Sequence, residues 1–395
     1  MPRILHFGVG NFFRAHQAAY TQGTRGWRIT GVSFRSSDVR DGLSAQGYDY
    51  ALLIKDAHET AIKRITVLDH MLVAPEASQA VIDAVADGEV KVITLTVSEK
   101  GYHLTPDGRL DLTHSALVAD LAGGSLTPVG ALVRGLSQRR DAVTVLSCDN
   151  LPDNGPKLAR AVHDFASAAG VPIPMNVTFP ASMVDRITPA TTDATRIEAD
   201  DPMTVPTEAF SEWVIEDHFA AARPDWPGVQ WVKDVAPHEM RKLRMLNGAH
   251  SYLAYAGILR GHTYVHEAVA DPDLRATTRT LMAEAAQTLP TEVQAQAAQY
   301  AGDLIARFEN PNLHHRLRQI AMDGSQKLPI RILATLAERT SDSPALEAAV
   351  AAWIGFVQAE VAAGRALDDP MADHIARACR TSDPTGALRA LIGAP

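Results

Sequence analysis

Cysteine is scarce in this chain of 395 residues, where Cys148 and Cys379 lie far apart. Two distant thiols make no disulfide framework, and this usage is typical of a reducing compartment. A large excess of charge of one sign is also missing, because the net charge is −9 and charged residues make up 21% of the chain. This balance gives no electrostatic reason to expect nucleic acid or an anionic membrane as a partner.

Long apolar runs and a secretory leader are missing too. The first residues lack the basic, apolar and small-residue order of a signal, and nowhere do eighteen apolar residues follow one another. We therefore expect a cytoplasmic protein without a membrane segment. The length predicts two domains with large cores, and no solenoid repeat interrupts this interpretation.

The first part of the chain alternates short apolar runs with helical patterns, which is typical of a parallel sheet with crossover helices. Helices are expected at 12–22, 78–86, 115–122, 128–138 and 155–169. Strands are expected at 3–7, 28–33, 91–96, 143–147 and 176–179. Two further β-rich stretches, 50–54 and 65–73, are expected to form an antiparallel insertion outside the repeated unit.

Proline, glycine and tryptophan gather in the segment "ARPDWPGVQWVKDVAP" at 222–237. Beyond it alanine-rich helical patterns dominate. The prediction is an α/β Rossmann-type dinucleotide-binding domain over 1–227 and an all-α domain over 228–395. Helices of the second domain are expected at 238–260, 274–289, 293–308, 313–321, 329–339, 345–362 and 371–379.

Glycines follow the first expected strand in "RILHFGVGNFFRAH". Gly8 suits a tight turn and Gly10 the close approach of a pyrophosphate to a helix N-terminus, although Phe13 stands where a third glycine is usual. An ordinary turn between strand and helix remains the alternative. The candidate cofactor contacts are Gly8, Val9, Gly10, Asn11 and Phe12.

The end of the second strand bears on the choice between NAD and NADP. Arg35 followed by two serines suits a 2′-phosphate, whereas Asp38 comes late for a ribose contact and is also placed to cap the next helix. A solvated surface arginine is the other interpretation of Arg35. The residues therefore leave the choice between NAD and NADP open.

The stretch "HEMRKLRMLNGAHSYLAYAG" sets polar groups among apolar neighbours. On an α-helix Lys242 and His250 differ by about 80° and Lys242 and Asn247 by about 140°, with Glu239 beside Lys242. Such groups are costly to bury alone, so they face water or serve a ligand. From the pattern by itself, a solvated lysine and a structural histidine remain alternatives.

Six segments, in order, are similar to one known family. They are "HFGVGNFFRAHQAAY", "TLTVSEKGY", "SCDNLPDNG", "FPASMVDRITPAT", the pattern Lys-x4-Asn-x2-His at 242–250, and "IAMDGSQKLPIR". The chain thereby resembles the mannitol dehydrogenase family of polyol-specific long-chain dehydrogenases and reductases. That family includes mannitol 2-dehydrogenases, arabinitol dehydrogenases and fructuronate reductases.

The resemblance implies a metal-independent oxidoreductase that uses NAD or NADP. It implies that Lys242 is the general base, which requires a pKa lowered from about 10.4. Asn247 and Asn150 are implied to donate hydrogen bonds to the reacting oxygen, one from each domain. For Asn150 the residues alone leave a turn or cap role open.

Four more residues are candidates. Eight residues of helix separate His250 from Lys242, so we expect His250 to hold a hydroxyl further along the substrate. By the resemblance, Asp185 and Lys327 are implied to contact substrate, with an ion pair between Asp185 and Arg186 as the alternative. Glu239 either passes on the released proton or pairs with a neighbouring base.

The chain departs from the mannitol-oxidising pattern at Gln319, where an arginine is expected. A polyol is the first substrate class we predict. The alternative is a sugar acid, reduced by a fructuronate-type enzyme, whose carboxylate needs a cation such as Arg186, Lys327 or Arg331. A catalytically silent dinucleotide-binding sensor is the third hypothesis. Relatives in this family are often monomers, which we expect here.

Overall fold

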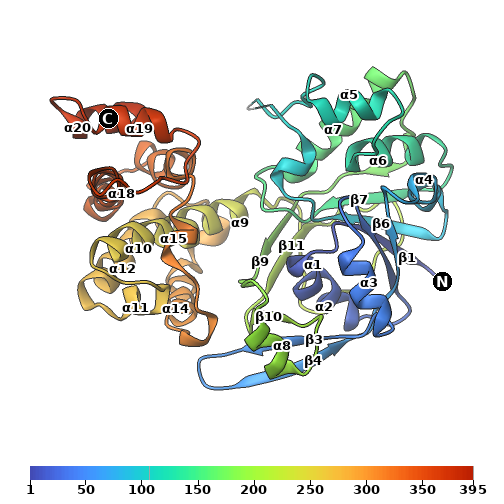
Figure 1. Ribbon diagram of the computed structural model, residues 1–395, viewed down its shortest axis with the longest axis horizontal. Coiled ribbons are helices and arrows are strands. Elements are labelled where there is room, and N and C mark those ends of the chain that lie inside the picture. The colour runs from blue at the N-terminus through green and yellow to red at the C-terminus, as the bar shows by residue number, and fades with distance from the viewer. Residues whose placement is uncertain (106, 395) are drawn as a thin grey trace. The chain divides into compact units, whose positions relative to one another are not determined.

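The structure is a computed structural model that describes residues 1–105 and 107–394, and it divides into two compact units, Met1–Val235 and Ala236–Pro395. Figure 1 colours the first unit from blue to yellow-green and the second from yellow to red. The sequence placed the boundary after residue 227. In the structure β12 (Gln230–Val232) pairs with β11 (Glu212–Glu216), so residues 228–235 belong with the first unit.

A six-stranded parallel sheet forms the centre of the first unit. Its order is β5-β2-β1-β6-β7-β8, in which β1 lies between β2 and β6 and the order reverses. This is the doubly wound order of dinucleotide-binding folds, as predicted. The strands are β1 (Arg3–Phe7), β2 (Arg28–Ser33), β5 (Leu68–Val73), β6 (Val90–Leu95), β7 (Val143–Ser147) and β8 (Val177–Thr178).

One strand assignment from the sequence is wrong. β3 (Tyr50–Lys55) and β4 (Thr60–Ile65) form the predicted antiparallel pair, but Leu68–Val73 pairs in parallel with β2 as the third strand of the main sheet. The run 65–73 contains no glycine or proline, so the sequence gives no sign that one strand ends and another begins within it. Four further strands, β9 (Ser182–Asp185), β10 (Val205–Glu208), β11 and β12, were not predicted.

Helices cover both faces of the central sheet, each over its own apolar core. Figure 1 shows α5, α6 and α7 on one side and α1, α2 and α3 on the other. The helices are α1 (Asn11–Ala15), α2 (Gln17–Gln22), α3 (Asp38–Ala45), α4 (Ser78–Ala86), α5 (Ser115–Leu121), α6 (Pro128–Ser137), α7 (Asn154–Ala169) and α8 (Asp193–Ala199). The expected helix 12–22 is two helices, because the backbone breaks from helical geometry at His16.

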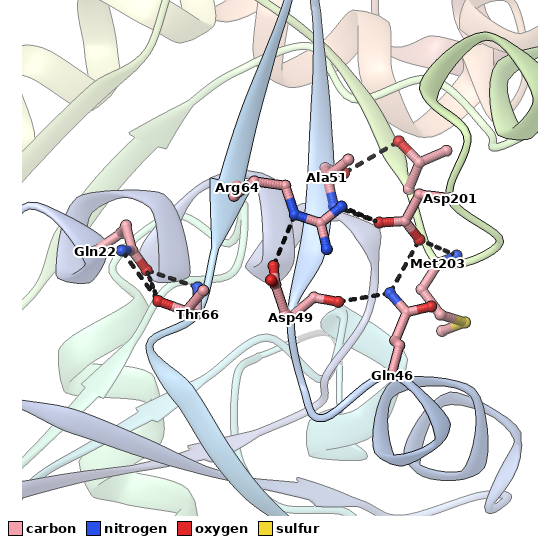
Figure 2. A network of polar contacts seen from close by, with 9 residues as sticks. Gln22, Gln46, Asp49, Ala51, Arg64, Thr66, Asp201 and Met203 are labelled. Carbon is pink, nitrogen blue, oxygen red and sulfur yellow. Dashed lines mark hydrogen bonds and ion pairs between the residues drawn. The ribbon is translucent and has the colours of Figure 1, made fainter.

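Asp201 ties the antiparallel insertion to the rest of the first unit (Figure 2). Its buried carboxylate accepts hydrogen bonds from the backbone N–H groups of Ala51 and Met203, each at 2.7 Å, and from the Gln46 amide at 3.0 Å. The Arg64 guanidinium bridges this carboxylate and that of Asp49. One buried anion thus fixes β3, β4 and the segment before β10.

Helices are the main elements of the second unit, as predicted. They are α9 (Ala236–Arg241), η2 (Lys242–Asn247), α10 (Gly248–Leu259), α11 (Val265–Ala270), α12 (Pro272–Ala286), α13 (Thr291–Gln294), α14 (Ala297–Phe308), η3 (Pro311–Leu313), α15 (Leu317–Ile320), α16 (Gly324–Leu328), η4 (Pro329–Leu333), α17 (Ala334–Ala337), α18 (Pro344–Ala362), α19 (Ala372–Ala378) and α20 (Pro384–Ile392). Two of them, η2 and η4, are π-helical and contact each other. By length and composition α18 could span a bilayer, but here it packs against α10 and α12 and half of it is buried.

His6 lies fully buried in β1, directly before the glycine turn. Its Nδ1 is 2.7 Å from the Thr94 hydroxyl, and its Nε2 is 3.0 Å from the Thr96 hydroxyl and 3.2 Å from the Gly8 carbonyl oxygen. Burial lowers the pKa of His6 to about 3, against a weaker opposing effect of the Gly8 carbonyl. The folded protein therefore keeps this ring neutral where an unfolded chain would protonate it.

We predict that His6 makes the first unit sensitive to acid. Because the unfolded chain takes up a proton near pH 6.5 and the folded chain only near 3, stability is present above 6.5 and is lost as the pH falls. Urea unfolding at pH 7.5 and 5 should show a loss that is about 2 kcal/mol smaller in His6→Gln than in the unchanged protein. Equal losses in the two proteins would contradict this assignment.

Candidate functional site

The turn after β1 is closely packed at Gly8 and open at Gly10. Gly8 has a φ of +96°, and a Cβ there would stand 2.1 Å from the Thr96 carbonyl oxygen. Gly10 is exposed, and none of the described residues comes within 4 Å of the place where its Cβ would stand. The turn therefore leaves an open approach to the backbone at the start of α1, which fits a dinucleotide pyrophosphate.

Phe13, at the place of the usual third glycine, packs inward. Its ring stacks on His6 with 3.6 Å between ring centres and is fully buried. Of the remaining candidates, Val9 packs beside Gly31 of β2, and Asn11 donates a hydrogen bond to the Thr191 hydroxyl at 3.1 Å. Phe12 stacks on His16. Asn11 and Phe12 therefore shape the turn through contacts within the first unit.

Arg35 follows β2 and is exposed, with its backbone N–H 3.5 Å from the Ser33 hydroxyl. Asp38 begins α3 and accepts a hydrogen bond from the Ser36 hydroxyl at 2.9 Å. The side chains at this strand end thus include an exposed cation and a carboxylate held by a serine. Such a turn suits either NAD or NADP.

Asn150 comes three residues after the last residue of β7 and is exposed at the carboxyl edge of the sheet. The residue before it, Asp149, is 8% exposed and was missed by the sequence analysis. Its carboxylate accepts hydrogen bonds from the N–H groups of Val97 and Ser98 and from the Tyr102 hydroxyl. The signal was present in the quoted motifs "TLTVSEKGY" and "SCDN", which begin at the ends of the neighbouring strands β6 and β7.

Asp185 ends β9 and is 5% exposed. β9 reaches the Asn150 turn through Asn154, whose amide N donates to the carbonyl oxygens of Asp149 and Ser182. Asn154 thus joins the residue before Asn150 to the first residue of β9, three residues before Asp185. Arg186, the alternative partner of Asp185, directs its guanidinium to the carbonyl oxygens of Ala15 and Glu208.

Lys242 and Asn247 begin and end the π-helical turn η2, which corrects the α-helical angles that we expected. In a π turn the hydrogen bonds run from i to i+5, so the chain winds more slowly than in an α-helix. Residues five apart, expected about 140° from each other, are therefore drawn toward the same side. Lys242 is 8% exposed and Asn247 is half-buried. π turns of this kind are frequent at functional sites.

His250 lies one turn further along, in α10, and is 7% exposed. Its Nε2 has no hydrogen-bond partner among the residues described, and neither has Nδ1 of His315, whose ring centre is 5.4 Å away. Burial, with His315, Arg307 and Arg331 nearby, holds the pKa of His250 well below its usual value, and burial lowers the pKa of His315 to about 4. Both rings are neutral at pH 7.

The pair His314 and His315 does not lie on a helix, contrary to the expectation from the sequence. His314 adopts left-handed backbone angles after η3. His314 is exposed, whereas His315 lies against His250. The sequence analysis therefore missed His315 as a neighbour of the candidate site.

The remaining candidates of the second unit lie on elements that adjoin the two π-helical turns. Glu239 is on α9, which η2 continues, and Lys327 is on α16, which leads into η4. Lys327 is half-buried, with its Nζ 3.4 Å from the Ile320 carbonyl oxygen and 3.9 Å from the Asp323 carboxylate.

Gln319, which stands where an arginine was expected, is exposed on α15 and lines a hollow of about 320 Å³ with Trp353. Over residues 1–105 and 107–394, no group of three or more His, Cys, Asp or Glu side chains is arranged to hold a metal ion.

Comparison with protein families covers both units. Residues 2–228 match the mannitol dehydrogenase Rossmann domain, and residues 234–390 match the mannitol dehydrogenase C-terminal domain. The chain belongs to the mannitol dehydrogenase family. It is therefore an oxidoreductase of the family that the sequence motifs indicated.

Individual relatives cover nearly the whole chain. An uncharacterized oxidoreductase of Escherichia coli K12, YeiQ, is 40% identical, covering 99% of this chain and 86% of its own length. The D-mannonate oxidoreductase of the same organism is 38% identical, covering 99% and 87%. The Pseudomonas fluorescens mannitol 2-dehydrogenase, solved as a ternary complex with NAD and D-mannitol, is 31% identical with a TM-score of 0.83, covering 99% and 91%.

The two glycines of the turn should respond differently to substitution. Gly8→Ala places a Cβ against the Thr96 carbonyl at a positive φ, so we expect unfolding to become easier by about 1–3 kcal/mol or more. Gly10→Ala meets open space and should leave the free energy of unfolding within about 0.5 kcal/mol. Urea titration of both variants measures the difference, and equal destabilisation would be inconsistent with the described turn.

Proposed function

We propose that this protein interconverts a secondary alcohol of a polyol and the corresponding ketose, with NAD or NADP as hydride carrier and Lys242 as general base. The observation that carries the proposal is the π turn η2, which draws a buried lysine and the Asn247 carboxamide toward one side of a helix. Membership of the mannitol dehydrogenase family and the ternary complex of the Pseudomonas relative support the reaction class.

The first unit supplies the cofactor site in this proposal. The turn at Gly8 and Gly10 leaves backbone exposed at the switch point between β1 and β6, where ligands bind in doubly wound sheets. Val9, Asn11 and Phe12 hold the shape of that turn. When bound, the nicotinamide ring supplies the acceptor or donor of the hydride. Arg35 is the residue that would meet the 2′-phosphate of NADP.

Three side chains act on the reacting oxygen of the substrate in this proposal. Lys242 removes the hydroxyl proton during oxidation, which requires its amine to be uncharged in the complex. Asn247 and Asn150 donate hydrogen bonds to the oxygen on which negative charge gathers, and donors already in place stabilise that charge without reorganisation.

Other residues have supporting roles in the proposal. Glu239, on the helix that leads into η2, passes the proton from Lys242 toward solvent. His250, with an unpartnered Nε2 within the described part of the chain, accepts a hydrogen bond from a substrate hydroxyl or donates one to it. Asp185 and Lys327 contact the remaining hydroxyl groups.

Lys242→Ala should abolish most of the turnover. Loss of a general base typically costs 10²- to 10⁴-fold in rate, so we expect kcat to fall by roughly 10³-fold while dinucleotide binding stays within a few-fold. Nicotinamide absorbance measures the rate, and fluorescence titration with NADH measures binding. Lys233→Ala, an exposed lysine outside the proposed site, is the matched control. Unchanged turnover in Lys242→Ala would refute the mechanism and favour the silent sensor.

A sugar acid is the second candidate substrate, and a specific observation favours it. The charged groups that act on His250 are the guanidinium groups of Arg307 and Arg331, both cationic. Arg331 lies in η4 and donates a hydrogen bond to the Ser251 hydroxyl at 3.2 Å, which holds it beside α10. A carboxylate at the end of the substrate would complement this charge. The D-mannonate oxidoreductase among the relatives has a substrate of this class.

The two substrate classes can be separated with one variant. If a carboxylate binds near Arg331, Arg331→Gln should lower kcat/KM for mannonate at least tenfold more than for arabinitol, because only mannonate loses an ionic partner. Rates with both substrates and both cofactors measure the ratio, and Arg279→Gln, an exposed arginine on α12, is the control. An equal loss on both substrates would exclude a carboxylate contact at Arg331.

A further inference from the structure

Asp149 joins the ends of two neighbouring strands of the parallel sheet. Its Oδ1 accepts a hydrogen bond from the Ser98 N–H at 2.9 Å, and its Oδ2 accepts one from the Val97 N–H at 3.1 Å and one from the Tyr102 hydroxyl at 2.7 Å. The Tyr102 hydroxyl shares a further hydrogen bond of 2.7 Å with the Ser147 hydroxyl. The carboxylate therefore connects the turn after β6, the 3-10 helix η1 (Glu99–Tyr102) and the end of β7.

The backbone that Asp149 holds is strained. Ser98 has a φ of 65° and a ψ of 161°, a region that side chains other than glycine rarely adopt. Such a conformation is energetically unfavourable and persists only where surrounding contacts impose it. The two hydrogen bonds to the N–H groups of Val97 and Ser98 are contacts of this kind. Strained residues of this type cluster at ligand sites.

The other side of the same turn is fixed as well. Asn154 donates to the Asp149 carbonyl oxygen at 3.2 Å and to the Ser182 carbonyl oxygen at 2.7 Å, and its own side-chain oxygen accepts the Ser182 N–H at 3.0 Å. Asp149 is thus held through both its side chain and its backbone. Asn150, the next residue, is exposed beside this fixed point.

We propose that Asp149 is a positioning residue, which holds the turn Val97–Ser98 and the end of β7 in one arrangement so that the Asn150 carboxamide meets the reacting oxygen. Asp149 does not touch the substrate in this proposal. It acts through Asn150, and the inference therefore rests on the proposed function of that side chain. Burial raises the pKa of the carboxyl, against the opposing hydrogen bonds from Tyr102, Val97 and Ser98, which are available only to an acceptor.

The test uses Asp149→Asn, which keeps the size of the side chain but replaces one acceptor oxygen by a donor amide. We expect faster hydrogen exchange in a peptide covering residues 97–102 of the free protein. We also expect kcat to fall at least tenfold, while the dissociation constant of NADH changes by less than threefold. The double variant Asp149→Asn/Asn150→Ala should have the kcat of Asn150→Ala within twofold, because both changes remove the same contribution.

Asp120→Asn is the matched control. Asp120 is another buried aspartate of the first unit, and it accepts hydrogen bonds from the N–H and hydroxyl of Thr127 and pairs with Arg134, away from the strand ends. This change should lower the free energy of unfolding but leave exchange at 97–102 and kcat per folded molecule within twofold.

Each outcome has a distinct meaning. Unchanged exchange at 97–102 in Asp149→Asn would overturn the proposal, as would faster exchange with an unaltered kcat, which would make Asp149 merely structural. Multiplicative losses in the double variant would show that Asp149 does not act through Asn150 and would also overturn it. If Asn150→Ala itself turns over at the unchanged rate, the proposed function of Asn150 fails, and the role of Asp149 fails with it. Failure of Asp149→Asn alone leaves the proposed function standing.

Discussion

The hydrogen-bond ladder of the parallel sheet continues past the ends of its strands, and the first unit depends on this continuation. The Gly8 N–H donates to the Val32 carbonyl, the Thr96 N–H to the Phe7 carbonyl and the Cys148 N–H to the Leu95 carbonyl, at 2.8–2.9 Å. The turns after β1, β6 and β7 therefore begin side by side at the same edge of the sheet. Gly8 can take part only because it lacks a side chain, since a Cβ would collide with the Thr96 carbonyl.

Buried polar groups recur where these turns must be held. His6 lies under the glycine turn, Asp149 between the turns after β6 and β7, and Asp201 under the antiparallel insertion. Each makes several hydrogen bonds to backbone or side-chain partners, which offsets the cost of removing it from water. In the second unit Lys242 and His250 are buried in the helical segment from α9 to α10, which also buries Arg241, Arg244 and Ser251.

The sequence predicted the doubly wound sheet and the helical second unit because their apolar periods are long and their boundaries are marked. The helix Ser78–Ala86, for example, has the predicted bounds. Leu68–Val73 was assigned to the wrong sheet because pairing partners depend on tertiary contacts that a local pattern does not contain. Comparison with protein families confirmed the class of protein that the resemblance implied, whereas the roles of Lys242, Asn150 and the other candidates stay predictions.

Three features of the candidate site could not have been predicted from local patterns. Angles on a helical wheel assume α-helical winding, so the π turn at Lys242–Asn247 was invisible to that calculation. Asp149 looked like part of a polar turn, and its importance appears only when β6 lies beside β7 and brings Val97 and Ser98 to its carboxylate. His315 likewise depends on a left-handed residue, His314, that no helical pattern indicates.

The π turn also limits how this segment can change during evolution. Its extra residue sets the relative direction of Lys242 and Asn247, so an insertion or deletion between them would rotate everything on one side against the other by roughly 100°. Point substitutions have no such effect on direction. We therefore expect the composition of this interval to vary among relatives while the five-residue spacing from Lys242 to Asn247 stays constant, even where the loops on either side differ in length.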